Sequence, residues 1–157
     1  MMKTTKQRVI NYIIIIASIL AVAGLGSIFV NLGMEWYDTL NRPTYFVPNF
    51  LIPIMWTIIY SIFAIVLCNW VSKEDLPKDT IILLILNGIF NVLWCLLFFT
   101  LNQPLWGVVS IVLLLILAYL LVANIYKYNK VYAYFTALYP IWVSIATTLN
   151  LALWILN

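Results

Sequence analysis

The sequence predicts an all-α integral membrane protein: one domain over residues 1–157, built as a bundle of five transmembrane helices. Hydrophobic residues make up 66% of the chain and charged residues 8%, whereas a soluble domain carries about 25% charged residues. The charges gather in four clusters, at positions 3–8, 35–42, 73–79 and 127–130. The uncharged runs between them are long enough to cross a bilayer, which takes about 20 apolar residues.

The first expected span is 9–31, directly after the cations Lys3, Lys6 and Arg8. An alternative is a cleavable signal peptide, because an apolar stretch and then Ala21-Val22-Ala23 follow these cations. The apolar run continues to Leu32, which favours a span.

Residues 32–50 are expected to form a loop, since they contain Glu35, Asp38, Arg42 and two prolines. The second span is expected over 51–71. The uncharged run 80–126 is long enough for two spans, 80–101 and 105–126, with Asn102-Gln103-Pro104 as the turn between them. The fifth span is expected over 132–155.

Lysine and arginine predict the orientation. The N-terminus and the loops after the second and fourth spans hold seven of the eight cations, and the 32–50 loop holds only Arg42. The N-terminus is therefore expected in the cytoplasm and the C-terminus outside a cell membrane, most simply a bacterial inner or plasma membrane.

Several function classes are disfavoured. The chain has no histidine, so a haem with a histidine axial ligand is excluded, and no residue spacing resembles a zinc or calcium site. No metal or required cofactor is expected. The net charge of +3 lies in the loops and indicates topology, not nucleic-acid binding. The expected spans contain no ionisable acid or base, which disfavours a proton-coupled drug exporter; sodium sites built from backbone carbonyls stay open.

Polar and aromatic residues form stripes on three expected helices. Asn87, Asn91, Trp94 and Phe98 share one helix face, as do Tyr139, Trp142, Ala146 and Asn150 on another helix, and Trp56, Tyr60 and Phe63 on a third. One interpretation is that each asparagine joins helices, because a buried amide needs a partner. The other is a shared, uncharged aromatic cavity for a flat hydrophobic ligand.

These stripes, together with the 32–50 segment, resemble the TspO/MBR family of tryptophan-rich sensory proteins and translocator proteins. The resemblance runs from about Gly24 to Asn157. The family's first-loop pattern matches Trp36-Tyr37, Leu40, Arg42-Pro43, Tyr45, Pro48 and Trp56, and its patterns on the third and fifth helices match Asn91, Trp94 and Phe98-Phe99, and Tyr139, Trp142, Ala146 and Asn150. The chain departs from the family at Val47, Pro53, Asn87 and Leu138.

The resemblance implies a five-helix bundle whose cavity opens toward the first loop, and a receptor for porphyrins such as protoporphyrin IX or haem-type tetrapyrroles. It also implies binding of benzodiazepine-type ligands and, for mitochondrial members, cholesterol. The ligand-binding residues are expected to be Trp36, Tyr37, Trp56, Tyr60, Asn87, Asn91, Trp94, Phe98, Tyr139, Trp142 and Ala146. In this interpretation Trp56 and Trp142 flank the ligand, Asn87 and Asn91 hydrogen-bond to it, and the 32–50 loop is a lid whose Trp36, Tyr37, Tyr45 and Phe50 roof the cavity.

Two function classes follow. The first is a binding protein that senses, carries or regulates tetrapyrroles. The second is an enzyme that degrades protoporphyrin with light and oxygen, using Trp56 and Trp142. The expected partners are a hydrophobic small molecule and membrane lipid. Ala17-x₃-Ala21 and Ala23-x₃-Ser27 suit either a homodimer or packing within the bundle.

Overall fold

The computed structural model of the chain describes residues 4–45 and 47–157. Lys3 of the N-terminal cation cluster and Phe46 of the predicted lid loop lie outside the described residues. The elements in chain order are α1 (Thr5–Thr39), α2 (Leu51–Lys73), α3 (Lys78–Cys95), the π-helical segment η1 (Leu96–Thr100), α4 (Pro104–Tyr128), α5 (Lys130–Thr136) and α6 (Leu138–Leu156). Because η1 continues α3 and α6 continues α5, they make five spans long and apolar enough to cross a membrane. The predicted five-helix membrane bundle is confirmed.

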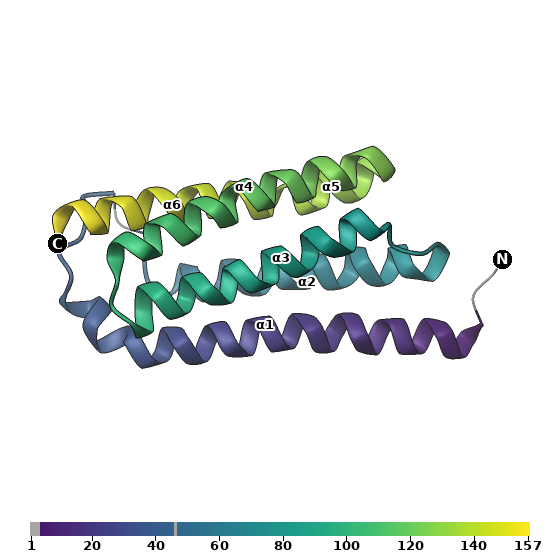
Figure 1. The fold of residues 1–157 in the computed structure, drawn as a ribbon, viewed down its shortest axis with the longest axis horizontal. Helices are drawn as coiled ribbons and strands as arrows, with labels where there is room; N and C mark the ends of the chain where they lie inside the picture. The colour runs from purple at the N-terminus through teal and green to yellow at the C-terminus, as the bar shows by residue number, and fades with distance from the viewer. Residues whose placement is uncertain (1–3, 46) are drawn as a thin grey trace.

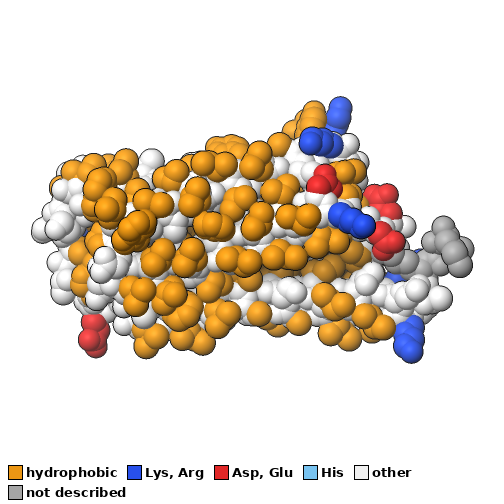
Figure 2. All heavy atoms as spheres, in the orientation of Figure 1, with side chains coloured by type: hydrophobic (Ala, Val, Ile, Leu, Met, Phe, Trp, Pro, Cys, Tyr) orange, Lys and Arg blue, Asp and Glu red, His pale blue; other side chains and the backbone are white. Residues whose placement is uncertain are grey.

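The helices run nearly parallel to one long axis, with α1 along one side, α4 and α6 along the other, and α2 and α3 between them (Figure 1). The N-terminus and the C-terminus lie at opposite ends of the bundle. Figure 2 shows hydrophobic side chains over the middle of the molecule and most charged side chains at the end where the N-terminus lies. This distribution is that of a multi-pass membrane protein.

Helix α1 is longer than the sequence suggests. It ends at Thr39 instead of near residue 31, so residues 32–39 of the expected loop are helical. Thirty-five residues make a helix about 52 Å long, which exceeds the bilayer core of about 30 Å, so its charged end extends beyond the hydrocarbon. The helix stops at the extended C-cap Leu40, close to Pro43, whose ring excludes helical backbone at the preceding residue.

Helix α1 is pressed against η1 near its C-terminal end. A Cβ atom at Gly33 would lie 2.8 Å from the Phe99 Cα and closer still to the Phe99 carbonyl group. The Thr100 hydroxyl also donates a hydrogen bond of 2.8 Å to the Phe29 carbonyl oxygen. The buried residues of α1, which are Gly26, Gly33 and Tyr37, all lie in its C-terminal half. The helix is therefore anchored to the bundle mainly at one end.

The π-helical segment changes which side chains face the core. The Leu101 N–H donates to the Leu96 carbonyl at 2.9 Å, a five-residue step. The wider turn buries the consecutive side chains of Phe98 and Phe99, which a 3.6-residue period would turn about 100° apart. Asn102 then adopts φ of 52°, a left-handed conformation that asparagine tolerates, and Pro104 begins α4.

The fifth span is divided at Ala137, between α5 and α6. Pro140 has no N–H to donate to the carbonyl of Thr136, four residues earlier, so the α-helical ladder loses one bond there. The break lies two residues before Tyr139, the first residue of the stripe that contains Trp142 and Ala146.

A polar cluster joins α3 to α4 near the N-terminal end of the bundle. The hydroxyl of the fully buried Thr80 donates to the Asn124 side-chain oxygen at 2.6 Å, and the Asn124 amide donates to the Asp79 carboxylate at 2.6 Å. The Tyr128 hydroxyl donates to the same carboxylate. The polar side chains of this cluster thus have partners within it, and their hydrogen bonds hold α3 and α4 in register.

Candidate functional site

An aromatic cavity lies at the C-terminal end of α1, enclosed by α2, α3, η1, α6 and the segment around Val47. Its volume is about 30 Å³, enough for one or two water molecules. We call it the aromatic cavity; its wall is formed by Tyr37, Val47, Ile52, Trp56, Trp94, Phe98, Phe99, Trp142, Ile145, Ala146, Leu149, Asn150 and Leu153.

Two hydrogen-bond donors in this wall have no partner among the described residues: the Tyr37 hydroxyl and the Trp142 Nε1. Both side chains are buried, with exposed fractions of 3% and 5%. A buried donor without a partner costs free energy of about 1–3 kcal/mol, so we expect a water molecule or a bound ligand to accept a hydrogen bond from each of these two groups.

The aromatic rings of the wall pack on one another. The Trp56 ring centroid lies 5.6 Å from that of Tyr60 in a stacked arrangement and 6.2 Å from that of Trp94. Trp94 is held by a hydrogen bond of 3.0 Å from its Nε1 to the Asn150 side-chain oxygen. The wall is therefore a continuous π surface whose orientation is fixed between α3 and α6.

Six of the eleven predicted ligand-binding residues line the aromatic cavity together: Tyr37, Trp56, Trp94, Phe98, Trp142 and Ala146. Phe99 also lines it, and the stripe spacing could not include Phe99 because the π-helical turn brings it inward. Asn150, part of the predicted stripe on α6, lies in the same wall and orients Trp94.

The other polar residues of the prediction lie deeper along the bundle and bond to other helices. The Asn87 amide donates to the carbonyls of Leu83 and Leu117, and its oxygen accepts from the Tyr139 hydroxyl at 3.1 Å. The Asn91 oxygen accepts from the Tyr60 hydroxyl at 3.4 Å. These bonds correspond to the interpretation in which the asparagines join helices. That Asn87 and Asn91 bind a ligand stays a prediction.

A second and larger hollow, about 1150 Å³, runs between α1 on one side and α2 and α3 on the other. Tyr60, Asn87, Asn91 and Tyr139 line it, and Trp56 lines both this hollow and the aromatic cavity. We call it the α1 groove. All predicted site residues except Trp36 therefore border one of two adjoining spaces.

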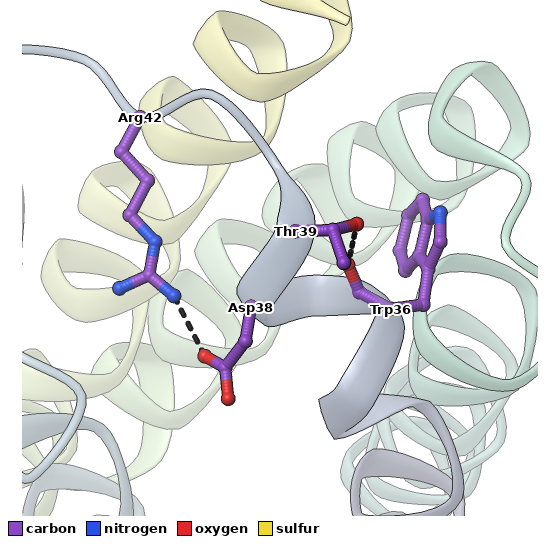
Figure 3. A network of polar contacts seen from close by, with 4 residues as sticks. All are labelled: Trp36, Asp38, Thr39 and Arg42. Carbon is purple, nitrogen blue, oxygen red and sulfur yellow. Dashed lines mark hydrogen bonds and ion pairs between the residues drawn. The ribbon is translucent and has the colours of Figure 1, made fainter.

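Trp36 supports the aromatic cavity from behind. Its ring meets Phe98 edge-on, with 5.5 Å between centroids. Figure 3 shows the end of α1 around it: the Thr39 hydroxyl donates to the Trp36 carbonyl at 2.7 Å, and Arg42 pairs with the Asp38 carboxylate at 2.7 Å. These local bonds terminate the helix and keep its charges at the surface.

The non-helical part of the predicted lid is residues 40–50, and of these Val47 lines the cavity. The expectation that Tyr45 and Phe50 roof the cavity is wrong, because both side chains are exposed and neither lines it. The loop is joined to the end of α6 instead: the Asn41 N–H donates to the Asn157 side-chain oxygen at 2.8 Å, and the Tyr45 hydroxyl donates to the Thr148 carbonyl at 3.4 Å.

Comparison with known proteins shows which family the chain belongs to. A sequence model of the TspO/MBR family matches residues 14–155. The chain belongs to the TspO/MBR family. The resemblance found in the tryptophan, tyrosine and asparagine pattern is thereby confirmed, and the aromatic cavity is the feature that this TspO/MBR chain builds from that pattern.

Relatives of this TspO/MBR chain cover most of its length. A tryptophan-rich protein TspO of Archaeoglobus fulgidus is 34% identical over 155 residues, which cover 94% of this chain and 99% of the relative. A protein of the same name from Chlorobaculum tepidum is 29% identical, with 96% and 98% covered. The protein CrtK of Rhodobacter capsulatus is 28% identical, with 78% of each chain covered.

Proposed function

We propose that this TspO/MBR protein is a membrane receptor for porphyrin-type tetrapyrroles, bound in the aromatic cavity, and that it senses or regulates their level. The observation that carries the proposal is the pair of buried donors without a partner among the described residues, Tyr37 and Trp142, in a wall of aromatic rings. A porphyrin such as protoporphyrin IX has flat π faces for the rings and carboxylate oxygens for the donors.

The cavity has to open for such a ligand, because about 30 Å³ holds only water. Two features favour opening. Among the described residues of the 40–50 loop Val47 lines the cavity, and the loop is joined to α6 and Asn157 through hydrogen bonds of Asn41 and Tyr45. Trp56 lines both the cavity and the 1150 Å³ groove, so the two spaces adjoin at this side chain.

A sensory or regulatory role in the membrane is what the family membership and the names of relatives support, including a tryptophan-rich sensory protein of Cereibacter sphaeroides at 24% identity. The excess of cations at the end where the N-terminus lies favours placing that end in the cytoplasm. The loop and the aromatic cavity would then face the outside.

The test is a titration of the purified protein with protoporphyrin IX, following tryptophan fluorescence. Tyr37→Phe removes one hydroxyl and keeps the ring and every tryptophan. If the hydroxyl donates to a ligand carboxylate, the dissociation constant rises by roughly tenfold. Trp142→Phe is expected to weaken binding similarly.

Tyr134→Phe is the matched control, since Tyr134 is 71% exposed and does not line the cavity. Its dissociation constant should equal that of the unmodified protein. Quenching that never saturates, or the same constant for Tyr37→Phe and Tyr134→Phe, would mean that the porphyrin partitions into the detergent or lipid instead of this cavity.

Illumination of the same samples separates receptor from enzyme. The contact of Trp56 with Tyr60 and Trp94 provides a set of oxidisable rings beside the proposed ligand, which is the observation that keeps light-dependent degradation as a second candidate. A new tetrapyrrole product that requires light, oxygen, Trp56 and Trp142 would support the enzyme. Binding without such a product supports the receptor.

A further inference from the structure

The α1 groove has dimensions that suit a lipid chain. On α1 its lining extends from Asn11 to Leu25, and on α2 from Trp56 to Val71. At about 1.5 Å per residue these stretches are about 21 and 22 Å long. One leaflet of the bilayer core is about 15 Å thick. The groove therefore crosses a whole leaflet, along the direction in which acyl chains lie.

The lining of the groove is mostly apolar, with aliphatic side chains from α1, α2 and α3 and the rings of Trp56 and Phe63. Two of its polar side chains form hydrogen bonds within the protein. The Ser18 hydroxyl donates to the Ile14 carbonyl at 2.7 Å. The Asn87 amide donates to the carbonyls of Leu83 on its own helix and Leu117 on α4, and the Asn87 oxygen accepts from the Tyr139 hydroxyl on α6. These polar groups therefore do not require water as a hydrogen-bond partner. In a membrane, we expect lipid acyl chains to fill this apolar space of about 1150 Å³.

The charged end of the groove favours one class of lipid. Lys78 lines the groove where α3 begins, and Arg8 lies one turn before the lining residue Asn11 on α1. The Arg8 Nε is buried without a hydrogen-bond partner among the described residues. Asp75 lines the same end, and Glu74 and Asp79 are the sequence neighbours of Asp75 and Lys78; the Asp79 carboxylate accepts hydrogen bonds from Asn124 and Tyr128 on α4. A phosphate group complements the guanidinium charge of Arg8 and the ammonium charge of Lys78.

We propose that the α1 groove binds one acyl chain of an anionic membrane phospholipid, with the headgroup phosphate between Arg8 and Lys78. The chain runs along α1 and α2 toward the middle of the membrane and ends against Trp56 and Tyr60. This lipid site meets the aromatic cavity at Trp56, and its test uses protein to which no porphyrin is added.

The test uses a photoreactive lipid. The protein is placed in phosphatidylcholine nanodiscs that contain a small fraction of phosphatidylglycerol with a diazirine at the end of one acyl chain. After irradiation, mass spectrometry locates the adducts. The expected result is adducts concentrated at the deep end of the groove, on α2 and α3 near Trp56 and Tyr60, and far fewer from phosphatidylcholine that carries the same diazirine.

Ser18→Phe places a ring in the groove and is expected to abolish most of these adducts. Ser27→Phe is the control. Ser27 lies nine residues after Ser18 on α1, so its side chain points to the opposite side of the helix. It is exposed and does not line the groove. Gel filtration of both variants checks that the bundle is intact.

The contact with the headgroup is tested separately by substitutions of charged residues at the end of the bundle. Arg8→Gln and Lys78→Gln should each reduce the adducts by roughly fivefold, whereas Lys127→Gln at the end of α4 should leave them unchanged. Adducts spread over all lipid-facing helices, equal labelling by the two lipids, or labelling that Arg8→Gln and Lys78→Gln leave intact would overturn the proposal.

Discussion

The contact between α1 and η1 at Gly33 predicts a large difference between two otherwise identical substitutions. In Gly33→Ala the new Cβ would lie 2.8 Å from the Phe99 Cα, whereas ordinary contacts begin at 3.4 Å. The two backbones must therefore separate by at least 0.6 Å, and by more at the carbonyl group. Since the obstacle is backbone, no side-chain rotation removes the clash.

Gly24→Ala on the same helix is the control, because nothing lies within 4 Å of its Cβ position. Both substitutions gain about 1 kcal/mol of helix propensity, so this gain cancels when the two variants are compared. What remains is the clash at Gly33, about 1–3 kcal/mol for an overpacked site. For a chain of this size that corresponds to a difference in unfolding temperature of roughly 2–12 °C.

The assay is thermal unfolding of both variants in the same detergent, followed by circular dichroism. We expect Gly24→Ala to unfold at or above the temperature of the unmodified protein and Gly33→Ala clearly below Gly24→Ala. Equal unfolding temperatures for the two variants would refute the close contact between α1 and η1, and with it the shape of the aromatic cavity on that side.

Two further predictions concern the aromatic cavity and the polar cluster. Ala146→Phe fills the cavity and should weaken protoporphyrin binding by roughly tenfold or more with unchanged helix content; Ala17→Phe, exposed on α1, is the control, and equal titration curves for the two variants would place the ligand elsewhere. Asn124→Leu leaves Thr80 and Asp79 without their shared partner and should lower the free energy of unfolding by about 1–3 kcal/mol. Adding Thr80→Val should restore part of that loss; a double variant less stable than either single variant would contradict the hydrogen bond between Thr80 and Asn124.

The number of spans could be predicted because charges are costly inside a bilayer, so the four charge clusters mark the ends of the hydrophobic runs. The end of α1 could not be predicted in the same way. Glu35 and Asp38 exclude residues 35–38 from the hydrocarbon but not from a helix, and the helix continues until the backbone restriction near Pro43.

The residues of the aromatic cavity were accessible to sequence analysis to the extent that they follow helical spacing. Trp94 and Phe98, or Trp142 and Ala146, lie one turn apart, so their stripes predict a shared face. Phe99 enters the wall only because η1 is wound more widely than an α-helix. The hydrogen-bond partners of Asn87 and Asn91 lie on other helices, so they depend on how α3 packs against those helices. The spacing of residues along α3 alone does not predict that packing.

The end of the chain described here is joined to the loop that contributes Val47 to the wall of the aromatic cavity. The Asn157 side chain accepts from the Asn41 N–H at 2.8 Å and donates to the Asn41 carbonyl at 3.1 Å, in the manner of a strand pairing with the 40–50 loop. Anything attached after Asn157, including a purification tag, would emerge beside this loop. Ligand affinities measured on C-terminally tagged protein would then describe an altered entrance, whereas a tag before Thr4 would lie at the opposite end of the bundle.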